Sequence, residues 1–211
     1  MRTRTEIDVE LVRPIDGSAA AARLIVGVTV DEVDEAVGLW SPYLKERTNA
    51  GAARPQHEHW EWNYKARAVD GMPGYVMCGV SCKSEMQALM LSDHAFSRSK
   101  HPDHFGSPIV YVAFLSTAPW NDTGIVPMPA YRGCGTILIQ EAVAHSIALG
   151  FKGRVGLHSL GQAEKFYRER CGMTDLGIDP DPDHEGLRYF EFTHESGHAF
   201  VMSFGINRGN L

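Results

Sequence analysis

The chain has 211 residues, of which 44% are hydrophobic and 22% charged, as is typical of a globular protein with its own core. Its formal net charge of −6, without any block of lysines and arginines, argues against nucleic-acid binding, because phosphate neutralisation supplies much of that affinity. No apolar run approaches the ~20 residues of a membrane span, so no membrane partner is expected. The four cysteines show no Cys-x-x-Cys spacing and the polar start shows no secretory signal, so we expect a cytoplasmic protein.

The first half of the chain predicts one helix and several strands. Glu6–Val12 alternates polar and apolar residues like a half-buried strand, whereas residues 31–47 repeat apolar residues three and four apart like a helix. We expect residues 1–211 to form a single domain, on which residues 1–55 could pack as an N-terminal extension. Further strands are predicted at Trp60–Val69, Tyr75–Cys82 and Met86–Leu91, as an antiparallel meander, and at Ile109–Thr117.

A glycine-bearing loop then opens a strong helical pattern. Residues 131–136 read Tyr-Arg-Gly-Cys-Gly-Thr, and the apolar residues that follow recur on one helix face up to a predicted cap at Gly150. Two glycines at a helix start let a ligand approach the backbone, where unpaired N–H groups and the helix dipole favour an anion. The loop is therefore a candidate anion site, with an ordinary tight turn as the alternative.

The last third of the chain alternates strands and helices. Val155–His158 predicts a short strand, Ser159–Gln162 a capping box, and Ala163, Phe166 and Tyr167 one face of a helix that ends near Gly172. A strand at Leu187–Phe192 and a helix capped by Thr193 follow. Strands clustered first and strand–helix units later predict an α+β fold with a mixed sheet.

The series Arg132-x-x-Gly135, a helix, a strand, and then Ala163-x-x-Phe166-Tyr167 before Gly172 resembles the GNAT superfamily of acyl-CoA-dependent N-acyltransferases. The resemblance covers about the last half of the chain. It implies a mixed, mostly antiparallel sheet flanked by helices, with a splayed strand pair at the cofactor cleft. It also implies acetyl-CoA as the acyl donor and no metal.

The resemblance assigns roles to particular residues. The pantetheine arm would run along Leu115, Ser116 and Thr117, and the pyrophosphate would meet Arg132, Gly133, Cys134, Gly135 and Thr136. Tyr167 would protonate the departing thiolate, unless it is a core tyrosine beside Phe166. His158, at the end of its strand, could deprotonate the amine directly or through water, with a purely structural histidine as the alternative.

By the same resemblance, the reaction would be direct transfer of an acetyl group to a primary amine of a small molecule or peptide, and a homodimer could form. Three features depart from the family pattern. Ile137 stands where the family has a second small residue, Trp120–Ala130 is an insertion, and one extra residue lies between Tyr167 and Gly172. Ile137, together with the absence of a carboxylate from the strand at 109–117, makes a coenzyme-A-binding module without catalysis a second hypothesis.

A third hypothesis comes from His194-Glu195-Ser196-Gly197-His198, which matches the spacing of zinc metallohydrolases. The residues after His198 contain no His, Asp or Glu as a third ligand, and Gly197 weakens a helix by ~1 kcal/mol relative to alanine. We therefore favour Thr193 as the N-cap of an ordinary helix over a zinc site.

Overall fold

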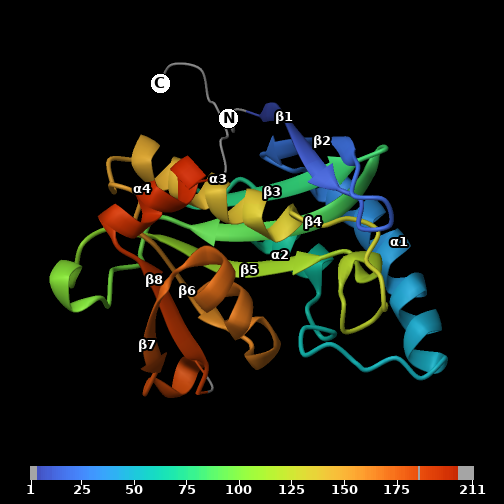
Figure 1. Cartoon of the computed structure of the whole chain (residues 1–211). Helices are drawn as coiled ribbons and strands as arrows, with labels where there is room; N and C mark the ends of the chain where they lie inside the picture. The colour runs from blue at the N-terminus through green and yellow to red at the C-terminus, as the bar shows by residue number, and fades with distance from the viewer. Residues whose placement is uncertain (1–3, 185, 204–211) are drawn as a thin grey trace. The chain divides into compact units, whose positions relative to one another are not determined.

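The structure of the protein is a computed structural model that describes residues 4–184 and 186–203. Its strands form an eight-stranded sheet in the order β1-β2-β3-β4-β5-β6-β8-β7 (Figure 1). The strands are β1 (Thr5–Val12), β2 (Ala19–Val26), β3 (Tyr75–Cys82), β4 (Glu85–Asp93), β5 (Val110–Thr117), β6 (Val155–Ser159), β7 (Thr174–Ile178) and β8 (Arg188–Phe192). β5 and β6 pair in parallel, whereas β1–β2, β2–β3, β6–β8 and β7–β8 are antiparallel.

The α-helices are α1 (Val30–Asn49), α2 (Trp62–Val69), α3 (Cys134–Ala148) and α4 (His194–Ser203). Together with the mixed sheet they confirm the predicted α+β class. None of the helices in the described ranges is long and apolar enough to cross a membrane. The chain forms two compact units, Met1–Leu91 with Phe114–Leu138 and Ser92–Ala113 with Ile139–Leu211, so that β5 and α3 each contribute to both.

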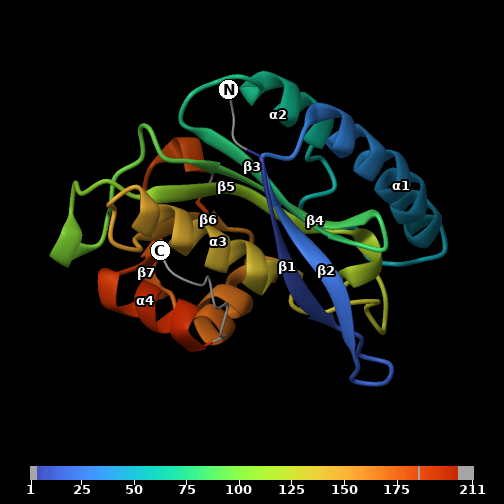
Figure 2. The same ribbon diagram turned by 90° about the horizontal axis from the view of Figure 1, so that it is seen from above.

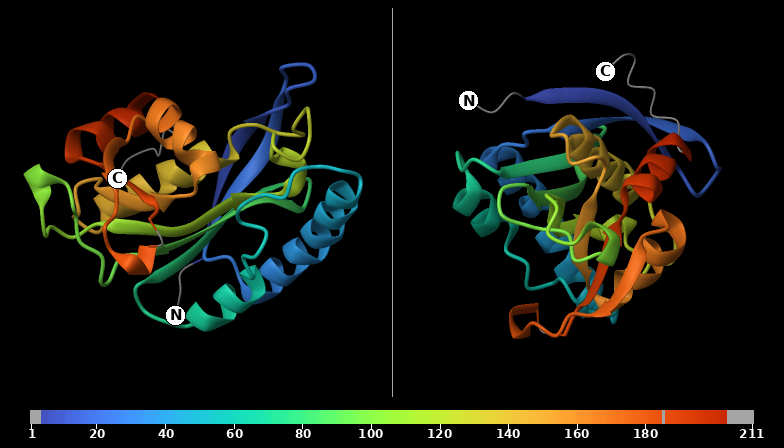
Figure 3. Two further views of the ribbon diagram at one scale, coloured as in Figure 1. Left: turned by 90° about the horizontal axis from the view of Figure 1, so that it is seen from below. Right: turned by 90° about the vertical axis from the view of Figure 1, so that its left-hand side faces the viewer.

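The first unit begins with the hairpin β1–β2 (Figure 3). The strand predicted at Glu6–Val12 is present, and Val12 lies opposite Ala19 in the antiparallel register. β2 was not predicted, because its four consecutive alanines favour a helix and hide the alternation. Only its second half carries apolar side chains of core size, Leu24 and Ile25, which are buried.

Helices α1 and α2 of the same unit lie side by side (Figures 2 and 3). The predicted helix at 31–47 is confirmed as α1, which begins at a capping box formed by Thr29 and Glu32. The Trp40 indole N–H donates to the Met86 carbonyl at 3.0 Å, which ties α1 to β4. Apolar residues of both helices and of the strands share one buried core.

The strand predicted at Trp60–Val69 is wrong, because residues 62–69 form α2. Aromatic residues at 60, 62 and 64 gave a period of two, but the third of them, Tyr64, is 70% exposed. The buried residues of the segment are Trp62, Ala66 and Val69, a spacing of four and three that belongs to a helix. The predicted meander therefore starts only at β3.

In the second unit, β6 and β7 both pair with β8. The predicted strands at 155–158 and 187–192 are confirmed as β6 and β8, whereas β7 was not predicted. α4 begins after Thr193, whose hydroxyl accepts from the Ser196 N–H at 3.2 Å, so the predicted N-cap is confirmed. Phe192 of β8 and Phe200 of α4 stack with ring centroids 5.2 Å apart, which packs α4 onto β8.

The helix predicted after β6 has a different start and a different pitch. The Ser159 hydroxyl donates to the Leu160 carbonyl at 2.9 Å, so the capping box predicted at Ser159 is wrong. Phe166–Cys171 is a π-helical turn, closed by Gly172, whose φ of 71° is left-handed and whose N–H donates to the Tyr167 carbonyl. A π turn takes up one residue more than an α turn, which accounts for the extra residue between Tyr167 and Gly172.

Candidate functional site

The loop that opens α3 lies in the first unit. Gly133 has a φ of 105°, which disfavours any side chain, and its carbonyl accepts the first helical bond, from the Ile137 N–H at 3.0 Å. The N–H groups of Cys134, Gly135 and Thr136 therefore have no acceptor within the helix. Such a helix start is chemically suited to a phosphate or pyrophosphate group.

Two contacts fix this loop. The backbones of Arg132 and Val12 exchange hydrogen bonds of 2.9 and 3.1 Å, so the loop is held by β1 while the Arg132 side chain stays exposed. Ile137 is only 6% exposed, so its side chain lies in the core and does not crowd the loop surface. The departure from the family pattern at Ile137 is therefore compatible with an anion at the helix start.

Cys134 of this loop is not set up as a nucleophile. Its side chain is buried, and burial raises the pKa of the thiol to about 12. The thiol is therefore protonated at neutral pH, and only backbone groups at this position are suited to meet a ligand.

The segment predicted to hold the pantetheine arm is the end of β5. Ser116 is buried and its hydroxyl accepts from the Trp62 indole N–H at 2.9 Å, so this side chain is already engaged. Leu115 and Thr117 are half-buried. A ligand running along this strand would thus meet backbone groups rather than the Ser116 hydroxyl.

β5 and β6 pair in parallel at the start of both strands. Val110 lies opposite Val155 and Tyr111 opposite Gly156 in the second unit. A splay of the two strands near residues 115–117 stays a prediction.

Tyr167 lies on the π-helical turn of the second unit. It is 7% exposed, with its ring 5.1 Å from that of Phe166 and 6.0 Å from that of Phe190, measured between centroids. Burial raises the pKa of its hydroxyl above the ordinary value, so the phenol keeps its proton at neutral pH. The position fits both roles predicted for it, a proton donor and a core tyrosine.

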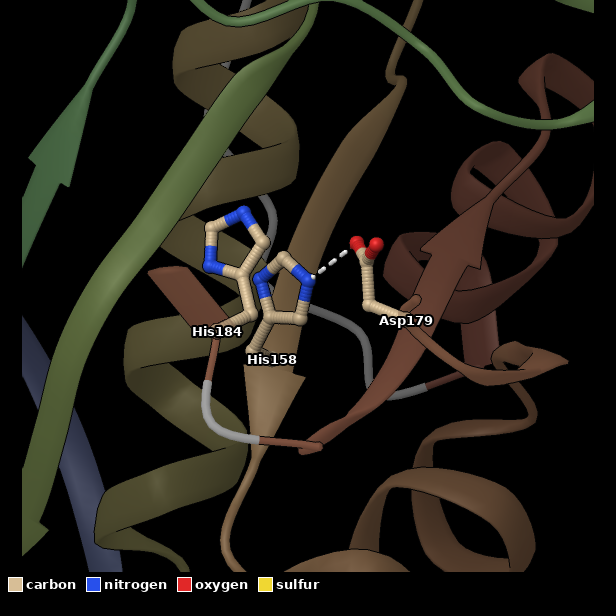
Figure 4. A group of neighbouring side chains, drawn as sticks. All are labelled: His158, Asp179 and His184. Atoms are coloured by element: carbon tan, nitrogen blue, oxygen red, sulfur yellow. Dashed lines mark hydrogen bonds and ion pairs between the residues drawn. The ribbon is translucent and has the colours of Figure 1, made fainter. Parts of the chain in front are cut away.

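His158 of β6 lies at the centre of a hydrogen-bonded chain in the second unit. Its Nε2 lies 2.8 Å from Oδ2 of Asp179, and its Nδ1 lies 2.7 Å from the Tyr111 hydroxyl. Figure 4 shows the His158 ring between the Asp179 carboxylate and the ring of His184. Both ring nitrogens are thus engaged in hydrogen bonds, and deprotonation of an amine by His158, directly or through water, stays a prediction.

Charge decides the direction of these hydrogen bonds. Burial alone would raise the pKa of Asp179, but hydrogen bonds from Lys100 and His158 lower it far below its usual range. Asp179 is thus a carboxylate that can only accept, so the proton of the neutral imidazole sits on Nε2. Nδ1 then has a lone pair, and the Tyr111 hydroxyl must donate to it.

His158, Asp179 and His184 are also the one group of potential metal ligands found in the described part of the chain, with ligand atoms within 4.8 Å of one another. The rings of His158 and His184 are stacked, with centroids 3.7 Å apart and planes at 18°. A metal lies close to the plane of each imidazole that binds it, so two nearly parallel rings cannot bind one ion without turning. In addition, the Lys100 ammonium contacts the same Asp179 oxygen.

The zinc-type motif lies on α4. The rings of His194 and His198 are 4.7 Å apart, but His194 Nδ1 lies 2.8 Å from the Lys152 carbonyl oxygen. A Cβ on Gly197 would lie 2.4 Å from the carbonyl oxygen of Gly153. The glycine of the motif is thus explained by close helix packing, and the glutamate by its place in the first turn of α4.

No protein-family model matches the sequence, and no curated protein matches it. Among solved structures, an uncharacterized protein from Bacillus halodurans aligns with a TM-score of 0.55 at 11% identity, over 95% of this chain and 97% of that chain. A structure provisionally named an acetyltransferase gives 0.51 at 14%, over 86% and 90%. The GNAT domain of S. lividans PAT gives 0.48 at 18%, over 89% and 96%. The chain therefore shares its fold with the structure that is provisionally named an acetyltransferase.

Sequence reasoning found His158 but missed the residues that define its chemistry. Tyr111 is 47 positions away and Asp179 21 positions away, and neither belongs to a motif. Tyr111 carried a usable signal, because its hydroxyl is the polar group among the apolar residues 110–115 of β5. Asp179 carried none, since it follows an unpredicted strand.

Proposed function

We propose that the chain is an acyl-CoA-dependent N-acyltransferase that moves an acetyl group from acetyl-CoA to a primary amine of a small molecule or peptide. The observation that carries this proposal is the start of α3. There, a left-handed Gly133 leaves three N–H groups without helical acceptors, in the loop that the resemblance to the GNAT superfamily assigns to the pyrophosphate.

The proposed reaction is direct transfer in a ternary complex. A neutral amine attacks the thioester carbonyl, a backbone N–H at residues 115–117 stabilises the oxyanion, and Tyr167 protonates the departing sulfur. Arg132 and the loop to Thr136 hold the pyrophosphate. All four cysteines are buried, which supports direct transfer over a covalent cysteine intermediate.

Binding of acetyl-CoA to the purified chain tests the proposal. A ligand that binds only the folded state raises thermal stability, so we expect Tm to rise with acetyl-CoA concentration. Gly135→Asp places a carboxylate at the helix start and should remove this rise. Gly38→Asp is the matched control, because Gly38 is exposed in α1 with open space around it, and its variant should keep the rise.

The outcomes separate an acyltransferase from a coenzyme-A-binding module. A rise in Tm that survives in folded Gly135→Asp would remove the pyrophosphate loop from the proposal. Acetyl-CoA binding without transfer to any member of a broad panel of primary amines would identify a binding module instead of an enzyme.

A further inference from the structure

The chain of groups around His158 has a fixed direction. Asp179 accepts from Nε2, which leaves Nδ1 as the acceptor of the Tyr111 proton. The His158 and Asp179 side chains are 3% and 5% exposed, whereas Tyr111 is only half-buried. Tyr111 is therefore the member of the chain that a ligand can reach.

We propose that Tyr111, His158 and Asp179 form a proton relay for the acyl transfer, in which the Tyr111 hydroxyl takes the proton from the attacking amine. This inference rests on the proposed function, because the amine and the thioester come from it. Tyr111 is the catalytic residue of the relay, His158 receives its proton, and Asp179 positions the imidazole.

The proton and electron pairs balance within this step. The amine nitrogen forms a bond to the thioester carbon, and the carbon–sulfur bond breaks with its electron pair on sulfur. One N–H proton moves to the Tyr111 oxygen while the Tyr111 proton moves to Nδ1 of His158. The resulting imidazolium is stabilised by the Asp179 carboxylate, as in a Ser-His-Asp triad, and later returns its proton to solvent through Tyr111.

Groups from several elements face His158. They are Tyr111 from β5, Lys100 from the loop before β5, Asp179 after β7, His184 from the turn Pro182–His184, and Tyr189 of β8. Burial, His184 and Lys100 lower the pKa of the imidazole and outweigh the carboxylate, which raises it. At neutral pH His158 is thus neutral. Burial also raises the pKa of Tyr111 to about 12, so the hydroxyl starts with its proton in place.

The main alternative to the relay is that the hydrogen-bonded residues Tyr111, His158 and Asp179 only stabilise the fold. Two Tyr→Phe variants discriminate between these two roles. Tyr111→Phe removes only the hydroxyl that contacts His158. Tyr189→Phe is the matched control. The Tyr189 ring lies 4.8 Å from the His158 ring, measured between centroids, but its hydroxyl is hydrogen-bonded to Glu191. We expect Tyr111→Phe to lower kcat by ~10²–10⁴, as for loss of a general base, and to keep acetyl-CoA binding. Tyr189→Phe should keep kcat within about threefold of wild type.

The pH profile of kcat gives a readout that a structural role would not change. In the wild type, kcat should fall on the acid side as His158 becomes protonated, with an apparent pKa below the ordinary value of about 6.5. The residual activity of Tyr111→Phe should lack this fall. An unchanged acid limb, or a Tyr111→Phe rate equal to that of Tyr189→Phe, would overturn the relay and leave the proposed function standing.

A measurement on the unmodified protein does not depend on any variant folding. ¹⁵N NMR between about pH 7 and 8 should show His158 protonated at Nε2 and bare at Nδ1. Protonation at Nδ1 would overturn the relay even if the enzyme is active. A wild-type chain that binds acetyl-CoA but transfers no acyl group would overturn both the relay and the proposed function.

Discussion

Tyr167 combines deep burial with a proposed role as proton donor. Burial raises the pKa of its hydroxyl, so the phenol is loaded with its proton throughout the neutral range. Tyr167→Phe keeps the ring contacts with Phe166 and Phe190 and removes only that proton. We expect kcat to fall by ~10²–10⁴ with acetyl-CoA binding nearly unchanged, measured by steady-state kinetics and thermal shift.

The control for this variant is Tyr64→Phe, which makes the same change at a tyrosine that is 70% exposed. It should leave both stability and rate unaltered. A folded Tyr167→Phe enzyme that keeps more than about a third of the wild-type kcat would assign Tyr167 to the core alone.

Single residues could be predicted where one local motif carries the chemistry. The helix start at 133–136 was found because glycines next to a helical pattern indicate exposed N–H groups. His158 was found as a candidate, but its hydrogen-bond partners Tyr111 and Asp179, which engage both ring nitrogens, were not. These two partners come from β5 and from the segment after β7 and leave no local pattern.

At the scale of elements, helices with buried faces were predicted well and aromatic-rich segments were not. α1, α3 and α4 were found from apolar residues at helical spacing, and Thr193 was correctly taken as a cap. In residues 60–69, three aromatic residues spaced by two outweighed the true helical spacing of the buried ones. An exposed aromatic such as Tyr64 carries no information about which face is buried.

The packing of α4 makes a sharp prediction about one glycine. Gly197→Ala would place a Cβ 2.4 Å from the carbonyl oxygen of Gly153, so α4 must shift away from that turn. We expect the free energy of unfolding to fall by ~1–3 kcal/mol, measured by urea denaturation, despite the better helix propensity of alanine.

Gly38→Ala in α1 is the matched control, because nothing lies within 4 Å of its added Cβ. That variant should gain ~0.5–1 kcal/mol from propensity alone. If Gly197→Ala gained stability like Gly38→Ala, the close approach of α4 to Gly153 would be wrong.

At the scale of the whole molecule, the α+β class and the mixed sheet followed from the order of predicted elements. The order of strands at both ends of the sheet did not, because β2 and β7 went unpredicted. β2 is hidden by its alanines, and β7 is a short strand with a register shift between Asp175 and Ile178, which breaks the alternation. The division of the chain into two units, which runs through β5 and through α3, also has no signal in composition.

Zinc bound by the two histidines of α4 would change the proposed function of the whole molecule from acyltransferase to metallohydrolase. His194→Ala with His198→Ala removes both potential ligands and the hydrogen bond from His194 to the Lys152 carbonyl. We expect a loss of ~1 kcal/mol in stability and acyl transfer within a few-fold of wild type.

Thr193→Ala is the control, because it removes the N-cap of α4, also worth ~1 kcal/mol, and leaves both histidines in place. Elemental analysis of the purified wild-type chain measures the metal directly. Zinc at one equivalent that disappears in the double variant together with activity, but not in Thr193→Ala, would replace the acyltransferase proposal with a metallohydrolase.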